Sequence, residues 1–240
     1  NPAKRNSLDH AILDGLAHAV AEADARCIIV TGADGMFSSG YDIGDIPDEV
    51  FAEEAEKLVA HPFTDALDAL DATDVPTIAA LPGHTIGGGL ELALCCDLRV
   101  AAEDIRLGMP PAKLGLVYSH TGLRRFIAAI GAPRTRELFL LGRNIDARTA
   151  ERWGLVNRVA DDDELQDVAL DLARELAGNA PLSLRGNKRI IRELLAADVR
   201  LDEQVERELI ALREACFRSE DMREGVRAFA EKRPPRWPGR

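Results

Sequence analysis

Three consecutive glycines, Gly87 to Gly89, separate two apolar segments and restrict what this chain of 240 residues can fold into. The segment before them, TIAAL (77–81), is typical of a buried strand. The segment after them, LELALCC (90–96), predicts a buried helix that carries one charge, Glu91. A strand that leads through a glycine loop into a helix is characteristic of α/β folds. Because glycine has no Cβ, the amides at the start of such a helix are open to an anionic ligand.

A second strand and glycine loop precede this unit. CIIVTG (27–32) predicts a buried strand, and ADGMFSSGYDIGDI (33–46) is a loop rich in glycine and serine. In an α/β domain both loops are expected at the same edge of the sheet, where one N–H from each could converge on a single oxygen.

The other elements follow from apolar spacing. Helices are expected over 7–24, with Ser7 as N-cap, and over about 50–71, and short strands over 98–103 and 104–109. From Thr121 onward the pattern predicts helix throughout. The sequence GNAP (178–181) breaks this helical part, so we expect a core over 1–178 and a C-terminal helical region over 179–240.

Composition and net charge argue against several classes of function. A net charge of −11 argues against nucleic acid or an anionic membrane as the main partner, since both require many cations. No apolar run approaches the roughly 18 residues that span a bilayer, and no signal peptide opens the chain. The four cysteines lie in apolar surroundings, which predicts reduced thiols in a cytoplasmic protein. The histidines form no ligand motif, so no metal site is expected.

The glycine loop has four possible explanations. A dinucleotide fingerprint needs GxGxxG and a P-loop needs GK[ST], and neither pattern is present. A tight turn with close helix packing is the simplest structural reading. An oxyanion hole, in which backbone N–H groups bind a carbonyl oxygen that gains charge, is the functional one.

The motifs VTGADGMFSSGYDI, PTIAALPGHTIGGGLELALCCDLRVAAED, GLVNRV and FAEKRPPRW together resemble the crotonase (enoyl-CoA hydratase/isomerase) superfamily over essentially the whole chain. The resemblance implies a ββα superhelical core, here without the family's N-terminal strand pair, and a C-terminal helical trimerisation region. It also implies an acyl-CoA thioester substrate whose enolate is held by two N–H groups, those of Tyr41 and Gly88. The side chain of Tyr41 is then free to vary.

The same resemblance implies two possible reactions, decarboxylation and hydration or isomerisation. Family hydratases use two glutamates, of which Glu91 matches the first, whereas Pro111 occupies the position of the second. The segment LGLVYS resembles methylmalonyl-CoA decarboxylases of the superfamily, in which the tyrosine lies next to the departing carboxylate. Decarboxylation of a (methyl)malonyl-CoA-type substrate is therefore the first expectation: Tyr118 would hold the carboxylate, and His120 would deliver a proton. A hydratase or isomerase that uses Glu91 is the alternative.

The resemblance further implies which residues bind coenzyme A. It also implies an oligomeric state. No cofactor is expected beyond the CoA moiety of the substrate, and we expect a homotrimer or a dimer of trimers. Remote alternatives are an RNA-binding protein or a scaffold that binds CoA without turnover. The expected CoA-binding residues are Lys4, Arg5, Ser39, Asp42, Ile43, Gly44 and Lys232.

Overall fold

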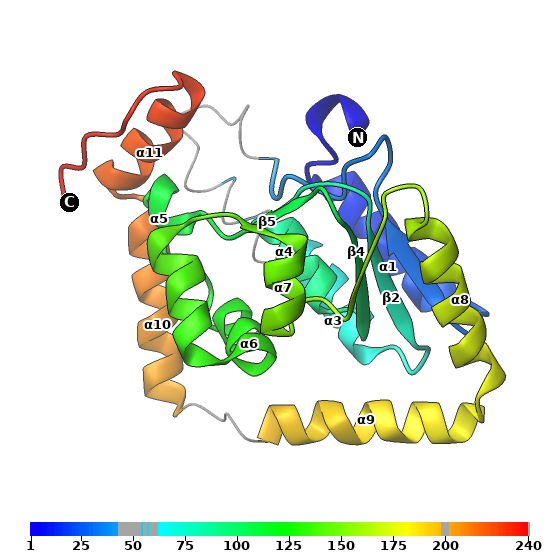
Figure 1. Ribbon diagram of the computed structural model, residues 1–240. Coiled ribbons are helices and arrows are strands. Elements are labelled where there is room, and N and C mark those ends of the chain that lie inside the picture. Colours follow the sequence, from blue (N-terminus) through cyan, green and yellow to red (C-terminus); the bar gives the residue numbers. More distant parts are fainter. Residues whose placement is uncertain (43–53, 55–56, 58–61, 198–201, 240) are drawn as a thin grey trace.

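The computed structural model describes residues 1–42, 54, 57, 62–197 and 202–239, and it confirms a mixed α/β fold (Figure 1). Four parallel strands form the main sheet in the order β1-β2-β4-β7. A smaller sheet with the order β3-β5-β6 lies beside it. The strands are β1 (Ile28–Thr31), β2 (Thr77–Leu81), β3 (Thr85–Ile86), β4 (Leu98–Ala102), β5 (Arg106–Gly108), β6 (Ile145–Asp146) and β7 (Arg158–Ala160).

The main sheet is built around β2, which is buried over its whole length. The prediction of a buried strand at 27–32 was wrong in degree, because β1 is the outer strand of the described sheet and remains half-buried. The prediction of helix throughout from Thr121 was also wrong, because β7 pairs with β4 and β6 pairs with β5. The side chain of Asn157 accepts a hydrogen bond from the Arg99 amide at 2.8 Å, which aligns β7 with β4.

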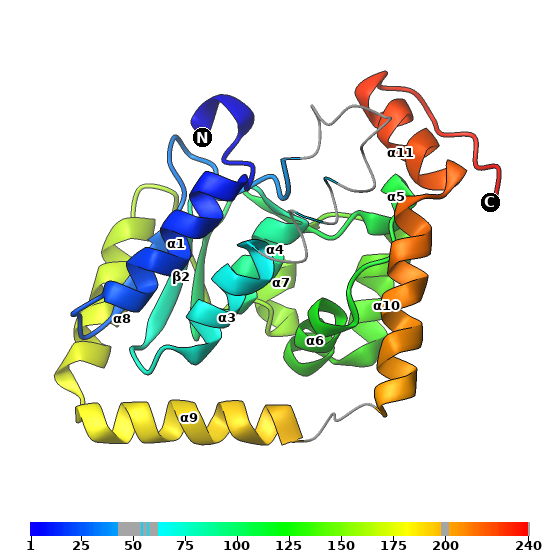
Figure 2. The same ribbon diagram turned by 180° about the vertical axis from the view of Figure 1, so that it is seen from behind.

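Helices cover the main sheet on both sides. Helix α8 lies against its strands, and Figure 2 shows α1 and α3 packed against each other with α8 on the far side. Side-chain caps begin several helices: Asp9 caps α1 and Ser119 caps α6. Helices of the first part are α1 (His10–Glu22), α3 (Thr64–Ala72), α4 (Gly88–Leu94), α5 (Pro111–Leu114), α6 (His120–Leu141), α7 (Ala147–Trp153) and α8 (Leu165–Gly178), after the 3-10 turn η1 (Pro2–Lys4).

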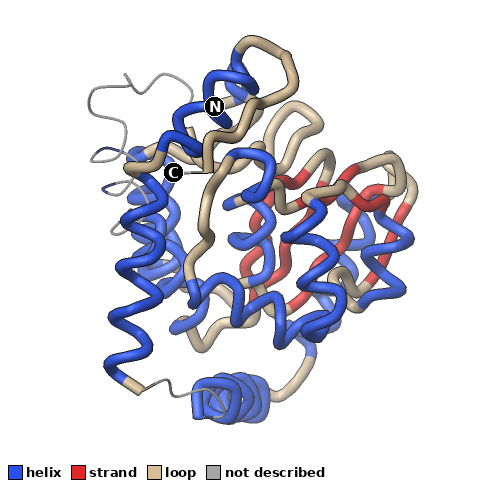
Figure 3. Tube along the Cα trace, turned by 90° about the vertical axis from the view of Figure 1, so that its left-hand side faces the viewer, coloured by secondary structure: helices blue, strands red, loops and turns tan. Residues whose placement is uncertain are grey.

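The described residues of the C-terminal region form three helices: α9 (Pro181–Ala197), α10 (Glu203–Phe217) and α11 (Glu220–Ala230). Figure 3 looks along α9, which stands apart from the sheet. Polar contacts nevertheless attach it to the core. Lys188 Nζ donates to Asp97 Oδ2 at 2.8 Å, and Arg192 Nη1 donates to the carbonyl of Ala72 at 2.9 Å, at the end of α3. No helix among the described residues is long and apolar enough to cross a membrane.

Candidate active site

The two predicted glycine loops lie side by side. Ser38 forms a bridge with Thr85, and its carbonyl accepts a hydrogen bond from the Ile86 amide at 3.0 Å. A Cβ added to Gly40 would lie only 3.3 Å from the nitrogen of Gly88. Gly40 also has a φ of 94°, which a residue with a side chain rarely adopts. The close approach of these two backbones therefore depends on glycine at position 40.

The amides of Tyr41 and Gly88 are the two predicted donors of the oxyanion hole. Leu8 pairs with the backbone on either side of Tyr41, through the Gly40 carbonyl at 2.8 Å and the Asp42 amide at 3.0 Å. Because extended backbone alternates its hydrogen-bonding direction, the Tyr41 N–H points away from Leu8. The Gly88 N–H lies in the first turn of α4, where a helix leaves its amides without internal partners. Neither N–H donates a hydrogen bond within the described part of the chain.

The side chain of Tyr41 is more constrained than the sequence suggested. Its ring lies on Gly88: a Cβ added there would be 2.9 Å from Cε1 and 3.1 Å from Cζ. The same ring makes an edge contact with Phe63, with centroids 4.7 Å apart. The ring therefore has tertiary contacts of its own, and the expectation that this side chain is free to vary stays a prediction.

Glu91 lies one turn inside α4 and is 1% exposed. Its Oε2 accepts a hydrogen bond from the Tyr118 hydroxyl at 2.6 Å, and its Oε1 lies 3.4 Å from Arg125 Nη1. Arg125 also pairs with Asp71 on α3. A Cβ at Gly122 would lie 2.9 Å from Glu91 Oε1, so this glycine in α6 makes room for the carboxylate.

Burial determines the protonation of this cluster. Desolvation raises the pKa of Glu91, although the Tyr118 hydrogen bond and the charge of Arg125 act in the opposite direction. Arg125 compensates only in part because Asp71 shares its charge. Burial and the charge of Glu91 also raise the pKa values of Tyr41 and Tyr118 well above their ordinary range. Both phenols are therefore neutral at physiological pH.

The other predicted catalytic residue, His120, lies at the first position of α6, and its Nε2 is 3.3 Å from Glu206 Oε1 on α10. The structure thus places its imidazole toward α10, and its role as a proton donor stays a prediction. Pro111 is buried at the start of α5 and places no carboxylate in the site. Lys113, two positions further on, lays its side chain over Gly142 at the end of α6.

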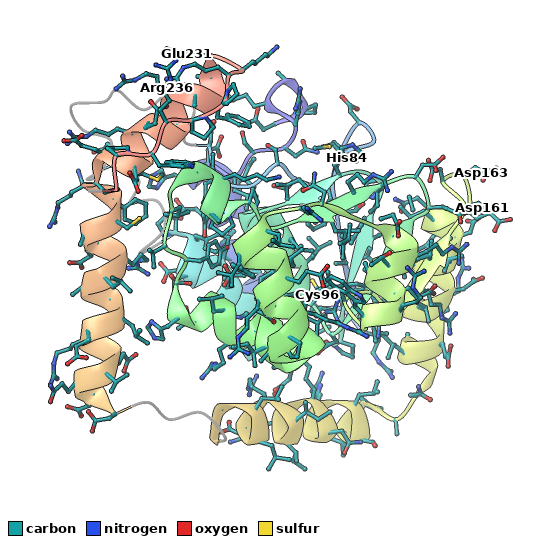
Figure 4. All side chains as sticks on the ribbon, turned by 60° about the vertical axis from the view of Figure 1, so that its left-hand side comes forward. His84, Cys96, Asp161, Asp163, Glu231 and Arg236 are labelled. Carbon is teal, nitrogen blue, oxygen red and sulfur yellow. The ribbon has the colours of Figure 1, made fainter. Side chains whose placement is uncertain are left out.

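Four of the residues predicted to bind CoA lie together. Lys4 Nζ and Asp42 Oδ2 form an ion pair at 2.9 Å, and the Ser39 amide donates to the Arg5 carbonyl at 3.1 Å. Ile43 and Gly44 lie outside the described residues. Lys232 is exposed just beyond α11, next to Glu231, which Figure 4 shows at the outer edge of the molecule. Their roles in binding stay predictions.

Sequence reasoning missed Arg125, Asp71 and Phe63 as members of the site. The single charge in an apolar helix does predict that such partners exist, because a buried carboxylate needs a cation or hydrogen-bond donors. The sequence offers many arginines and does not say which one faces Glu91.

Comparison with known proteins identifies the family. The family model described as enoyl-CoA hydratase/isomerase matches residues 1–240. The 2,3-dehydroadipyl-CoA hydratase of Escherichia coli K12 is 33% identical over 247 aligned positions, covering 100% of this chain and 92% of that protein. The carnitinyl-CoA dehydratase of Salmonella agona is 36% identical over 226 positions, covering 91% of this chain and 84% of that protein.

Solved structures show the same relationship. A methylmalonyl-CoA decarboxylase in complex with 2-nitronate-propionyl-CoA superimposes with a TM-score of 0.90 at 28% identity, covering 100% of this chain and 92% of that one. The chain therefore belongs to the enoyl-CoA hydratase/isomerase family, the crotonase superfamily of acyl-CoA enzymes.

Proposed function

We propose that this enzyme decarboxylates a (methyl)malonyl-CoA-type thioester. The amides of Tyr41 and Gly88 bind the thioester oxygen and stabilise the enolate that remains when CO₂ departs. The observation that carries the proposal is the short hydrogen bond between Tyr118 and Glu91, which engages the carboxylate that a hydratase needs free. The likeness to methylmalonyl-CoA decarboxylase over the whole chain supports it.

A two-carboxylate hydratase fits the site less well. Hydration needs one group that takes a proton from water and one that protonates the α-carbon. Pro111 stands where the second glutamate is expected, and both oxygens of Glu91 already have partners, Tyr118 and Arg125. Decarboxylation requires no base, because departure of CO₂ itself generates the enolate.

A hydratase or isomerase that works through Glu91 is the second candidate. Its support is the burial of Glu91, which raises the pKa of this carboxyl in the direction that a general acid requires. The relatives that are 33% and 36% identical carry the names of a hydratase and a dehydratase, which agrees with this reading.

Substrate assays separate the two candidates. We expect CO₂ release from malonyl-CoA or methylmalonyl-CoA, followed by mass spectrometry of the thioester product. Tyr118→Phe is expected to lower this rate by about 100-fold, because the hydroxyl is removed from the site while the aromatic ring remains. Brisk hydration of crotonyl-CoA without CO₂ release would show instead that the enzyme is a hydratase.

We further propose that α9 and α10 join copies of this chain into a trimer or a dimer of trimers. Ile190 and Leu194 on α9 are 58% and 64% exposed, and Leu212 on α10 is 57% exposed. A cavity of about 1200 Å³ lies between these two helices and α6. Large apolar side chains that are exposed together on neighbouring helices are typical of a protein–protein interface.

The double variant Ile190→Asp, Leu194→Asp is expected to dissociate the assembly, because two buried carboxylates per chain would oppose association. Sedimentation velocity should give three or six chain masses for the wild type and one for the variant. Leu170→Asp on α8, where the side chain is 40% exposed, is the matched control and should leave the mass unchanged. A wild-type protein that sediments as a single chain contradicts the proposal.

A further inference from the structure

Arg192 of α9 contacts the end of α3. Its Nη1 donates to the carbonyls of Asp71 and Ala72 at 2.7 and 2.9 Å. These are the last two residues of α3, where a helix leaves its carbonyls without internal partners. A guanidinium is favourable there because the C-terminus of a helix carries partial negative charge. Arg192 therefore fixes the last turn of α3, which carries the Asp71 side chain.

The Asp71 side chain connects this turn to the buried carboxylate. It forms an ion pair with Arg125 Nη2, and Nη1 of the same guanidinium lies 3.4 Å from Glu91 Oε1. Glu91 Oε2 in turn accepts the Tyr118 hydroxyl at 2.6 Å. The exposed fraction of the side chain decreases from 39% at Asp71 to 17% at Arg125 and 1% at Glu91. Direct contacts thus connect the C-terminal region with the innermost group of the candidate site.

Arg125 lies between the two carboxylates. Gly122, one turn before it on α6, leaves room for Glu91 Oε1, since an added Cβ would be 2.9 Å from that atom. Asp71, Arg125 and Arg192 also line the cavity of about 1200 Å³ between α6, α9 and α10. The contacts therefore cross from α9 to α6 along the wall of this cavity.

We propose that Arg125 and Asp71 are positioning residues for the reaction, and that Arg192 holds them in place, so that α9 controls the orientation of Glu91 and Tyr118. The proposal does not depend on the choice between the two candidate reactions. In the first, Glu91 orients the Tyr118 hydroxyl, and in the second, Glu91 acts on the substrate itself. The C-terminal region thus has a role in the active site of its own chain, in addition to the role in assembly proposed above.

The titration of Glu91 measures this arrangement without any substrate. Burial raises the pKa of the neighbouring thiol and of both phenols well above their ordinary ranges, so these three groups stay neutral. Glu91 is therefore the buried acid of this set that titrates first as the pH rises. The titratable and charged groups that act on it come from several elements: Arg125 of α6, Asp71 of α3, Cys95 of α4, Tyr41 of the glycine loop and Tyr118 before α6.

Nuclear magnetic resonance of tyrosine labelled with ¹³C at Cζ reports this titration. Tyr41 and Tyr118 are the two tyrosines of the chain, so the variant Tyr118→Phe assigns both signals. The Tyr118 signal should move as Glu91 gains or loses its proton, because the Tyr118 hydroxyl donates to that carboxylate. The same midpoint in His120→Gln shows that the signal does not follow the nearby imidazole, and a titration lost in that variant removes the assignment to Glu91.

The two members of the ion pair should move the Glu91 midpoint in opposite directions. Arg125→Met removes a positive charge that favours the carboxylate, so the midpoint should rise. Asp71→Asn removes a negative charge that opposes the carboxylate, so the midpoint should fall. A pair with a purely structural role would give shifts in the same direction or none, and either result rejects the positioning role.

Arg192→Met and Lys188→Met form a matched pair on α9. The two residues lie one turn apart, and each variant removes one positive charge that attaches α9 to the core, but Lys188 donates to Asp97 at 2.8 Å. Arg192→Met should lower the Glu91 midpoint, as Asp71→Asn does, because the loosened end of α3 withdraws the Asp71 charge. Loss of the Arg192 charge acting directly on Glu91 would raise the midpoint instead. Lys188→Met should leave the midpoint unchanged.

A double variant tests whether Arg192 acts through Asp71. When Arg192→Met is combined with Asp71→Asn, the midpoint should equal that of Asp71→Asn alone, because the second change removes the charge through which the first acts. Additive shifts would reject this route. Equal shifts in Arg192→Met and Lys188→Met would also reject it, since they would show an effect of α9 docking as a whole.

The rate of CO₂ release from malonyl-CoA provides a second measurement. Arg192→Met should lower kcat by about 10-fold with little change in KM, because a small displacement of a positioned group lowers the rate of the chemical step. Lys188→Met should retain the wild-type kcat, and Arg192→Lys should recover part of the loss because it keeps a cation at the end of α3. A wild-type kcat in Arg192→Met contradicts the proposal. If the wild-type enzyme releases no CO₂, the proposed function fails, and the titration of Glu91 still decides whether α9 acts on the site.

Discussion

Gly88→Ala is expected to lower kcat by about 100-fold or more, with little change in the midpoint of urea unfolding. The new Cβ would lie 2.9 Å from Cε1 and 3.1 Å from Cζ of Tyr41. The ring must therefore move, which shifts the phenol and disturbs the space in front of the Gly88 N–H. The nearest atoms all belong to one side chain, so the backbone does not have to move, and alanine favours the helix by up to about 1 kcal/mol.

Gly89→Ala is the matched comparison and should behave in the opposite way. Its Cβ would lie 2.6 Å from Ser38 Cβ and 2.9 Å from the Ser38 carbonyl oxygen, which accepts the Ile86 amide. Relief of this clash requires backbone movement, which typically costs about 1–3 kcal/mol of stability. Urea unfolding and kcat should be measured for both variants at one protein concentration. Equal unfolding midpoints for the two would contradict the distinction drawn between these neighbouring glycines.

The elements that could be predicted from sequence are those whose signal is local. The apolar run TIAAL becomes the fully buried β2, and the glycines before LELALCC become the first turn of α4. The approach of the two loops also followed from local signals, because parallel strands place the loops that follow them at the same edge. Position 40 then confirms the approach through a backbone contact that only glycine permits.

The partners of Glu91 could not be predicted, because they depend on where helices pack. Arg125 comes from α6 and lies 34 positions away, and Asp71 comes from α3 on the other side. Helical spacing predicts which face of a helix is apolar, and it does not predict which neighbouring helix supplies a given cation. Local pattern also failed for β7, where Arg158–Ala160 is too short to show a period and becomes a strand by pairing with β4.

Tyr41 shows the same limit of sequence-based prediction, because its amide could be assigned from sequence and its side chain could not be placed. Its amide was assigned from a resemblance in the backbone motif SSGY, which specifies a turn and no side-chain direction. The ring is placed by tertiary contacts with Gly88 and Phe63, and neither contact leaves a periodic signal in the sequence. The position of this side chain is therefore visible only in the fold.

Arg99→Met is expected to lower the free energy of unfolding by about 3 kcal/mol. Arg99 on β4 is 9% exposed, and its guanidinium donates to the carbonyls of Leu155 at 2.7 Å and Cys96 at 2.6 Å. Figure 4 labels Cys96 among the side chains of the interior, and it is 3% exposed. Each unsatisfied buried carbonyl typically costs about 1–3 kcal/mol, whereas methionine preserves the apolar packing of the stem.

The control for this loss is Arg148→Met, which breaks an exposed ion pair with Glu103 at 2.9 Å and should change stability little. Arg99→Lys should fall between the two, because a single ammonium group on a shorter side chain cannot replace the guanidinium at both carbonyls. Unfolding in urea at a fixed protein concentration, followed by circular dichroism, measures all three variants. An equal loss for Arg99→Met and Arg148→Met would mean that the carbonyls of Leu155 and Cys96 do not need the guanidinium. In that case β4 and the segment before β7 would be held by the ladder and by Asn157 alone.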